Sequence, residues 1–450
     1  MKGVREMDFV MQIPPAVHGM MDVLHENGFD AYLVGGCVRD ALMGLTPHDY
    51  DITTNARPEQ IIALFGEEDC TWYGKAFGTV CVHRDGGQAE VTTYRTEGDY
   101  TDSRHPGRVD FADDVHDDLS RRDFTCNAIA YDPRTGLLDP YHGADDLQNS
   151  ILRAVGTADQ RFSEDALRIL RGLRFYARFG LVPEAATDAA MRAHAPELAN
   201  ISVERVFTEL CGMLKGEHIT TVLLTYPDVL AVWIPEITPC VGFEQHSKWH
   251  DFTVWEHIAR TVGNVVPDLP LRLAMLFHDI AKPDCFTLDA RGGHFMGHAH
   301  RSAVKADHAL KRLRCDNRTR EQAVQLIELH RGVPKRMSTC RRLLGELGEE
   351  QFWRLIQVME SDRVSKWRDR AGSRERIDRM EECLNGHMTQ GLCCGIADLE
   401  IDGRDLIALG YQGREIGEML HMVLEEVIHD RLRNEREALL EYVRHVPGTS

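Results

Sequence analysis

The sequence predicts an α+β protein, with a small N-terminal mixed α/β domain followed by a long all-helical region. Three observations support this fold class. Short segments with strand propensity are concentrated in the first third of the chain. From Ser163 onward, apolar residues recur at the spacing of a helix face. A chain of 450 residues also exceeds what one hydrophobic core usually organises, so several consecutive domains are expected.

The elements expected, in order, are three strands and then helices. The strands are Ala31–Val34, Gly78–Val82 and Ala89–Tyr94. The helical region begins with Leu167, Leu170 and Leu173, which fall on one helix face. Turn-forming residues interrupt the periodic segments near 139–143, 234–242 and 385–386. The expected domains are 1–145, 146–235, 236–375 and 376–450.

Composition narrows the class of protein further. A formal net charge of -19 argues against indiscriminate nucleic-acid binding, because neutralising phosphates requires Lys and Arg. Residues 1–8 include acidic side chains where a secretory signal would be apolar, and no segment has the roughly 20 apolar residues that span a bilayer. The 12 cysteines form no Cys-x-x-Cys pair. We therefore expect a cytoplasmic protein with reduced thiols and no membrane partner.

A first group of polar residues follows the strand expected at 31–34. Gly35 and Gly36 stand where a strand passes into a helix, and glycines there let backbone amides approach phosphate oxygens. Alone, such a glycine pair is better explained by a plain strand-to-helix turn. Asp49 and Asp51 then occupy alternate positions, so a strand would present both carboxylates on one face. Because Mg²⁺ prefers hard oxygen ligands, the sequence predicts a magnesium site at this aspartate pair.

Two further motifs combine arginines with carboxylates. The Arg122 guanidinium suits phosphate oxygens, and Asp123 can accept a hydrogen bond from a ribose hydroxyl. Asp165 and Arg168 are close to one helical turn apart, so their side chains can share a face. Taken alone, the first motif would be explained by exposed arginines beside a capping aspartate, and the second by an intrahelical salt bridge.

Together the motifs resemble the class II nucleotidyltransferases of the tRNA nucleotidyltransferase and poly(A) polymerase family. The matching residues are Gly35-Gly36-x-Val38-Arg39-Asp40 through Gly44 to Asp49-x-Asp51, Arg121-Arg122-Asp123-Phe124-Thr125-x-Asn127-Ala128, and Glu164-Asp165-x-x-Arg168. The resemblance implies a nucleotidyltransferase head, a helical neck that recognises the base, an HD body and a helical tail that binds tRNA.

The same resemblance implies the reaction and its residues. Nucleotides from CTP and ATP would be added without a template to the 3′ end of tRNA, with Asp49 and Asp51 as catalytic Mg²⁺ ligands. One acceptor and one fork donor, here Asp165 and Arg168, are what reading a base edge requires. The nucleotide-binding residues implied are Gly36, Arg39, Arg122, Asp123, Asp165, Arg168, Arg171 and Arg174.

Further segments indicate which branch of this family the chain resembles. Residues 401–407 and 410–417 resemble the C-terminal region of the tRNA-specific members, and a basic extension typical of poly(A) polymerases is absent. The polar segment 95–106 resembles the flexible loop of members that complete the whole CCA sequence. We therefore expect addition and repair of the tRNA CCA end. A CC-adding, A-adding or polyadenylating enzyme remains the alternative, and the oligomeric state is left open.

A second group of residues lies in the helical region. His257, the adjacent pair His278-Asp279, and Asp362 resemble the ligand set of HD-domain phosphohydrolases. Imidazoles with carboxylates suit Mn²⁺, Ni²⁺, Fe²⁺ or Zn²⁺ better than Mg²⁺ alone. His298, His300 and His330 could serve a second ion.

By this resemblance, a hydrolase acting on RNA 3′ phosphates or 2′,3′-cyclic phosphates is a further expectation. The alternative interpretation is a former metal site that now has only a structural role. Two alternatives of other classes are an HD phosphohydrolase with a nucleotide-binding head and a non-enzymatic RNA-binding scaffold, which would predict damaged metal ligands.

Overall fold

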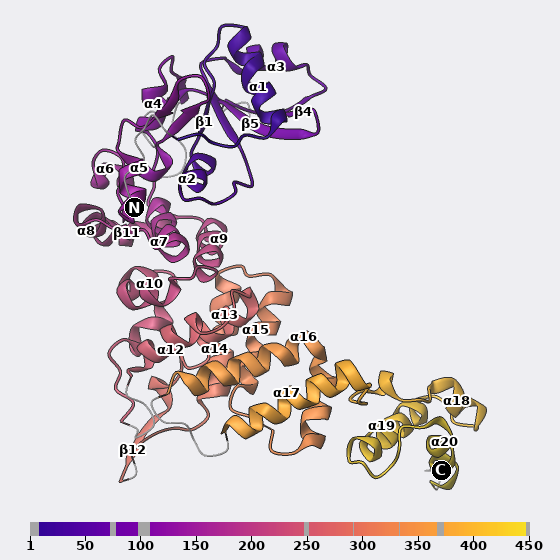
Figure 1. Cartoon of the computed structure of the whole chain (residues 1–450). Coiled ribbons are helices and arrows are strands. Elements are labelled where there is room, and N and C mark those ends of the chain that lie inside the picture. Colours follow the sequence, from indigo (N-terminus) through magenta and orange to yellow (C-terminus); the bar gives the residue numbers. More distant parts are fainter. Residues whose placement is uncertain are drawn as a thin grey trace. The chain divides into compact units, whose positions relative to one another are not determined.

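The computed structural model describes residues 9–72, 78–97, 109–246, 252–290, 292–332, 334–366 and 373–446 (Figure 1). The chain divides into two compact units, Met1–Pro235 and Glu236–Ser450. This division falls at one of the expected domain boundaries, and the finer division into four domains stays a prediction.

A seven-stranded sheet organises the first part of unit 1. Its strand order is β3-β4-β5-β2-β1-β8-β9, and only the pair β2 and β5 is parallel. The strands are β1 (Tyr32–Val34), β2 (Asp51–Thr54), β3 (Cys70–Trp72), β4 (Thr79–Arg84), β5 (Gly87–Thr93), β8 (Ala130–Asp132) and β9 (Gly136–Leu138). The three strands predicted from the sequence correspond to β1, β4 and β5, so that expectation is confirmed.

Short strand pairs and helices complete this unit. The pairs are β6 (Arg95–Glu97) with β7 (Val109–Phe111), and β10 (Ile151–Leu152) with β11 (Val182–Pro183). The helices are α1 (Pro15–Glu26), α2 (Gly36–Leu42), α3 (Pro58–Phe65), α4 (Val115–Ser120), α5 (Gly143–Gln148), α6 (Ala158–Glu164), α7 (Leu167–Phe179), α8 (Ala185–Ala193), α9 (Val203–Leu214), α10 (Ile219–Thr225) and α11 (Pro227–Ala231). Helix α1 begins with Pro15, a residue that suits the first helical position, and buries Met20 and Leu24 in the core beside the sheet.

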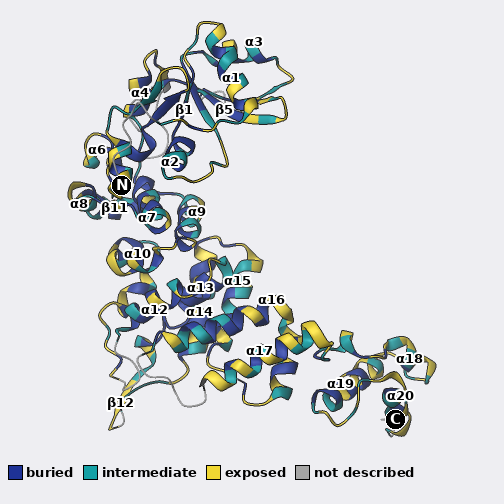
Figure 2. Ribbon diagram, in the orientation of Figure 1, coloured by how far each residue is buried: buried dark blue, intermediate teal, exposed yellow. Residues whose placement is uncertain are grey.

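Helix α7 shows how the sequence pattern positions a functional face. Leu170 and Leu173 are buried, as their spacing predicts, and this leaves Arg171 and Arg174 on the face that lines a pocket. The helix ends at Gly180, whose left-handed backbone (φ 71°) is favourable for glycine. Figure 2 shows buried residues gathered along β1 in this unit and along α13 in the other.

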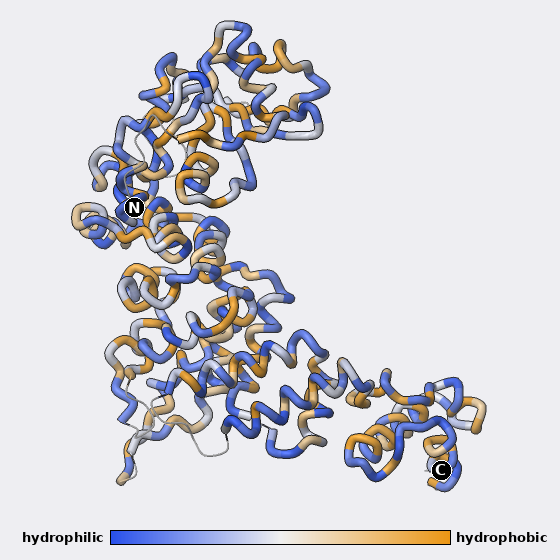
Figure 3. The backbone as a smooth tube through the Cα atoms, in the orientation of Figure 1, coloured by the Kyte–Doolittle hydropathy of each residue, from blue (hydrophilic) through white to orange (hydrophobic). Residues whose placement is uncertain are grey.

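The second unit is mostly helical, and Figure 3 shows apolar and polar residues alternating along its helices. Its helices are α12 (Val254–Gly263), α13 (Leu269–Phe277), α14 (His298–Arg312), α15 (Asn317–Leu329), α16 (Met337–Val364), α17 (Ser373–Gln390), α18 (Gly403–Ala408), α19 (Arg414–Ile428) and α20 (Arg436–His445). Residues 393–446 carry a hydrophobic core of their own, built mainly on α19. Among the described residues, no helix is long and apolar enough to cross a membrane.

One hairpin departs from the expected all-helical region. Strands β12 (Phe286–Asp289) and β13 (Gly292–Phe295) pair antiparallel between α13 and α14. Each strand has four residues, too few to show a period in the sequence. Gly293 is required there because a Cβ atom would lie 2.3 Å from the Gln245 carbonyl oxygen. The overall α+β class is confirmed, with this small addition to the helical part.

Candidate active site

A pocket of about 620 Å³ opens in unit 1 between the sheet and helices α7 and α9. All eight residues predicted to bind the nucleotide line it, together with Asp51. Its arginines from the sheet region are Arg39, Arg95, Arg121 and Arg122, and those from the following helices are Arg168, Arg171, Arg174 and Arg205. Such a concentration of guanidinium groups favours a polyanionic ligand.

The two predicted metal ligands do not share a strand face. Strand β2 begins at Asp51, where pairing with Val34 of β1 and Glu90 of β5 starts. Asp49 lies in the bend that precedes the strand and is exposed. Pro47, which lacks a backbone donor, stands in the irregular segment before the bend. The prediction that alternation along one strand aligns the aspartates is therefore wrong, although the two carboxylates still interact electrostatically.

The structure adds a third carboxylate that the sequence argument missed. Glu90 is the direct partner of Asp51 in the β2–β5 register and lines the same pocket. Burial, Glu90 and, more weakly, Asp49 raise the pKa of Asp51 to about 6, against the opposing charge of Arg122. None of the described residues donates a hydrogen bond to the Asp51 side chain. A cluster of carboxylates without bonded partners suits a divalent cation.

A buried carboxylate holds the arginine pair in place. Asp118 is fully buried; its Oδ1 accepts from Arg121 Nη2 at 2.6 Å and its Oδ2 accepts from Arg122 Nη2 at 3.0 Å. Burial alone would raise the pKa of Asp118, but the two guanidinium charges outweigh it and the pKa is lowered. The Arg122 Nε is buried without a hydrogen-bond partner among the described residues. Arg122, which lines the pocket, thus retains one donor that is not bonded to any described residue.

This anchoring gives a first prediction. Asp118→Asn should lower the free energy of unfolding by about 3 kcal/mol, because it leaves two partly buried arginines without a counter-charge. It should also weaken nucleotide binding through the misplaced Arg122. Urea unfolding and nucleotide titration measure the two effects. Asp117→Asn is the matched control, since Asp117 is exposed on the same helix; equal effects of the two substitutions would contradict the assignment.

Asp123 is bonded within the protein. Its Oδ2 accepts from Arg171 Nε at 2.8 Å, and its Oδ1 accepts from the Phe124 amide and the Asn127 side chain. Burial would raise the pKa of Asp123, but Arg171 and these hydrogen bonds lower it to about 2. The residue lines the pocket as an ionised anchor that connects α7 to the arginine motif.

The predicted pair Asp165 and Arg168 does not form an ion pair with each other. The Arg168 guanidinium donates to Glu164 Oε2 at 2.6 Å and to the backbone carbonyls of Arg161 and Arg121. Asp165 instead binds Arg205 Nη2 at 2.7 Å through Oδ2. The shared-face argument failed because Asp165 is extended between α6 and α7 rather than inside one helix.

Gly35 and Arg39 shape the pocket floor. Gly35 has a left-handed backbone (φ 70°), and a Cβ atom there would lie 3.0 Å from Arg122 Nη1. Gly36 opens α2 and lines the pocket. Arg39 is nearly buried, donates to Asp40 and Asn127, and stacks on Phe179 at 4.7 Å. The predicted loop 95–106 lies outside the described residues from 98 onward.

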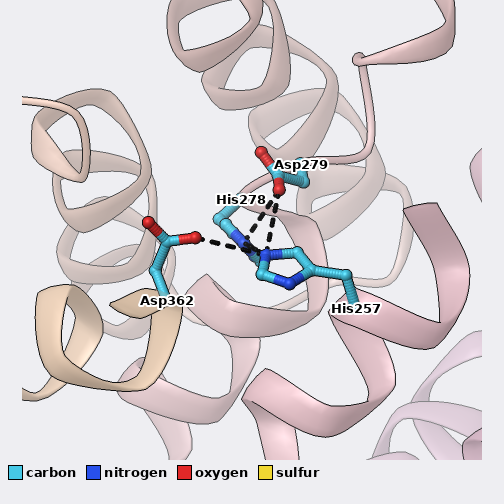
Figure 4. A group of neighbouring side chains, drawn as sticks. All are labelled: His257, His278, Asp279 and Asp362. Atoms are coloured by element: carbon cyan, nitrogen blue, oxygen red, sulfur yellow. Dashed lines mark hydrogen bonds and ion pairs between the residues drawn. The ribbon is translucent and has the colours of Figure 1, made fainter. Parts of the chain in front are cut away.

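Unit 2 gathers the second predicted group. His257 from α12, His278 and Asp279 from the end of α13, and Asp362 from α16 are all buried, and their ligand atoms lie within 4.8 Å of one another (Figure 4). The His257 Nε2 is 3.3 Å from Asp279 Oδ2 and 3.2 Å from Asp362 Oδ1. Asp279, His298 and His330 form an adjoining group.

Backbone carbonyls orient the histidines of this centre. The Nδ1 atoms of His278, His298 and His330 lie 2.5–2.8 Å from the carbonyl oxygens of Met275, Phe295 and Ile327. A carbonyl oxygen only accepts, so each Nδ1 carries a proton and each Nε2 is turned toward Asp279. Burial lowers the pKa of His330 to about 3, which keeps that imidazole neutral.

The fit of this centre to a metal ion rests on its unsatisfied atoms. Asp279 Oδ1 and the Nε2 of His298 are buried without hydrogen-bond partners among the described residues. Lys282, also buried, forms an ion pair with Asp279 Oδ2 at 2.6 Å. His300 does not join the group, because it is exposed and pairs with Glu328; that expectation is wrong.

The fold and the pocket together resemble those of nucleotidyltransferases. Three family descriptions match the sequence: the poly A polymerase head domain over residues 31–153, the probable RNA and SrmB-binding site of polymerase A over 180–240, and a putative tRNA nucleotidyltransferase domain 2 over 295–443. Each description matches less than half of the chain, and together they relate three of its segments to tRNA nucleotidyltransferases and poly(A) polymerases.

Individual relatives agree with this family. The chain is 48% identical over 195 residues to the CCA-adding enzyme of Streptococcus pyogenes serotype M2; the match covers 43% of this chain and 48% of the relative, about half of its length. The Bacillus stearothermophilus CCA-adding enzyme in complex with CTP is 25% identical, with a TM-score of 0.69 over 96% of this chain and 98% of that one. The Thermotoga maritima CCA-adding enzyme complexed with tRNA has the same fold, at 18% identity and a TM-score of 0.64 over 97% of each chain.

Proposed function

We propose that this chain adds and repairs the 3′-terminal CCA of tRNA without a template, using CTP and ATP and releasing pyrophosphate. The observation that carries the proposal is one pocket in which the Asp51 and Glu90 carboxylates adjoin eight arginines and the base-reading candidate Asp165. Solved relatives in complex with CTP, ATP and tRNA support these substrates and this partner. A cytoplasmic location, as the sequence predicts, accompanies the proposal.

In the proposed reaction the carboxylates hold divalent metal, with Mg²⁺ as the ion that oxygen ligands favour. Asp51 and Glu90 would be ligands from paired strands, and Asp49 a ligand from the preceding bend. When bound, the metal would activate the RNA 3′ hydroxyl and stabilise the leaving pyrophosphate. The chain itself supplies position and charge, and Arg122, anchored on Asp118, would donate to the phosphates.

The pKa of Asp51 gives a second prediction. Because it is raised to about 6, the carboxylate is protonated below pH 6 and must lose that proton for a metal to bind. Mg²⁺ affinity should therefore be about tenfold weaker at pH 5 than at pH 7. Calorimetric titration of the protein measures the affinity at both values. Asp51→Asn should remove most of the pH dependence, and an affinity that is the same at both pH values in the unsubstituted protein would contradict the prediction.

The experiment that tests the function compares RNA substrates. The protein is incubated with Mg²⁺ and each labelled nucleoside triphosphate, with a tRNA transcript that lacks CCA and with an unstructured RNA of equal length. We expect C and then A on the tRNA and little incorporation on the unstructured RNA. Long runs of A on both RNAs would identify a polyadenylating enzyme, and no incorporation at all would remove the proposal.

The buried centre of unit 2 supports a second function. With imidazole and carboxylate ligands, it would hold Mn²⁺, Ni²⁺, Fe²⁺ or Zn²⁺ through His257, His278, Asp279 and Asp362, and a second ion through His298 and His330. Asp279 Oδ1 and His298 Nε2, which have no hydrogen-bond partner among the described residues, favour metal binding over a purely structural role. An HD phosphohydrolase acting on RNA 3′ phosphates or 2′,3′-cyclic phosphates would complement the repair of tRNA ends.

A further inference from the structure

Helix α9 contacts residues of the pocket through two side chains one turn apart. Arg205 Nη2 donates to Asp165 Oδ2 at 2.7 Å, and Glu209 Oε2 accepts from Arg174 Nε at 2.6 Å. Residues four apart lie on one helix face, so this face of α9 holds one acceptor and one donor of the pocket. None of the family motifs in the sequence includes Arg205, and only the fold reveals its contact with Asp165.

The Asp165 carboxylate is fixed at both oxygens. Its Oδ1 accepts from the Leu167 amide at 3.0 Å in the first turn of α7, and its Oδ2 is bonded to Arg205. The Leu167 contact is local, whereas Arg205 is 40 residues away in sequence. Removing Arg205 would therefore leave the carboxylate free to rotate about a single remaining bond.

Arg205 also forms part of the pocket wall. It lines the pocket together with Asp165, and its Nη1 is buried with no hydrogen-bond partner among the described residues. A buried donor without an acceptor costs free energy unless a ligand or water satisfies it. Arg168, which was predicted to read the base together with Asp165, is held by Glu164 and by backbone carbonyls.

The orientation of one acceptor matters for base selection. Cytosine and adenine each present an amino group beside an unprotonated ring nitrogen, whereas uracil and guanine present a carbonyl oxygen beside a ring N–H. A carboxylate fixed toward the amino group accepts from the first two bases and repels the carbonyl of the others. A carboxylate that rotates loses this discrimination because it no longer faces one edge of the base.

We propose that Arg205 is a positioning residue that sets nucleotide selectivity by fixing the Asp165 carboxylate. This inference rests on the proposed nucleotide-binding role of the pocket. It assigns to α9 a part in choosing CTP and ATP over UTP and GTP, with no contact to the reacting atoms.

Equilibrium binding of CTP, UTP, ATP and GTP to the full chain, measured by calorimetry without RNA, tests the proposal. In Arg205→Met, the ratio of CTP to UTP affinity and that of ATP to GTP affinity should each fall about tenfold. Arg205→Lys keeps a cation for Asp165 and should retain most of the discrimination. Arg192→Met is the matched control: Arg192 also bridges helices of unit 1 but does not line the pocket, so both ratios should be unchanged.

A double substitution shows whether Arg205 acts through Asp165. Asp165→Asn should itself lower the discrimination, and adding Arg205→Met should then change it little, because coupled residues are not additive. The proposal would be overturned if Arg205→Met weakened the binding of all four nucleotides equally, if Arg205→Lys did not retain the discrimination, or if the effects of the two substitutions were additive. It would also be overturned if the unsubstituted protein bound the four nucleotides with equal affinity. The readout does not require catalysis. A protein that discriminates in binding but incorporates nothing would therefore refute the proposed function and leave this inference standing.

Discussion

Asp51→Ala is expected to lower nucleotide incorporation into tRNA by on the order of 10³-fold. Asp51 is the carboxylate at which β2 pairs with both β1 and β5, and it lines the pocket beside Glu90. Without it, the cluster would lose the central metal ligand that we propose. Because the raised pKa shows that the charged carboxylate is unfavourable in the metal-free site, its removal should not lower the stability of the fold.

Rates measured at saturating CTP, with thermal unfolding of each variant, check this prediction. Asp113→Asn is the control, because Asp113 is an exposed carboxylate of the same unit that pairs with Arg57. Glu90→Gln should also lower the rate of nucleotide incorporation. If Asp51→Ala kept more than a tenth of the rate while Glu90→Gln lost it all, Asp51 would not be the central ligand.

Asp279→Asn is expected to abolish stable metal binding in unit 2. Asp279 is shared by both groups of potential ligands, and its oxygens adjoin four histidines. The amide keeps the shape but supplies one weaker ligand and no charge. After loading with Mn²⁺ or Ni²⁺ and dialysis, the unsubstituted protein should retain about one ion per chain or more, and the variant less than a tenth of that.

His300→Ala is the control for metal content, because His300 is exposed and pairs with Glu328 outside the centre. Release of phosphate from RNA with 3′-phosphate or 2′,3′-cyclic phosphate ends should require the metal and disappear in His278→Ala. If the unsubstituted protein bound no transition metal under any loading condition, the centre would have only a structural role. Nucleotide incorporation should be unaffected by His278→Ala or His300→Ala, since the two sites use residues of different units.

The sequence predicted which residues would meet in the active-site pocket better than how they would be bonded there. Gly36, Arg122 and Asp165 come from separate motifs, yet all line one pocket, because each motif carries residue types with a specific chemistry. The bonding partners could not be predicted. Arg168 sits near Asp165 in sequence but binds Glu164, since the chain between α6 and α7 is extended.

The residues missed have a common physical cause. Glu90 lies in an ordinary alternating strand, and only the register between β2 and β5 places it beside Asp51. Asp118 and Arg205 are single charged residues on short amphipathic stretches, where a solvated helix face is the usual interpretation. Their roles depend on contacts between elements, which residue spacing does not contain. A carboxylate in a strand expected next to a metal-ligand strand was the one available signal for Glu90.

The residues of the unit 2 centre, by contrast, were named from the sequence. His278 and Asp279 are adjacent at the end of a buried helix, so their placement needed little tertiary information. His257 and Asp362 come from two other helices, and the structure brings both to the same point. His300, which was expected to be a possible ligand, follows His298 by two residues, a spacing that turns it to the opposite side of α14.

The most direct test of the central claim is the sequence of RNA 3′ ends after reaction. Purified protein is incubated with Mg²⁺, CTP and ATP and with tRNA transcripts that end before CCA, after C and after CC. The account predicts completion to CCA on all three transcripts, with no extension beyond the final A and none at all with Asp51→Ala. Extension that stops at CC, an unlimited run of A, or unchanged activity in Asp51→Ala would contradict it.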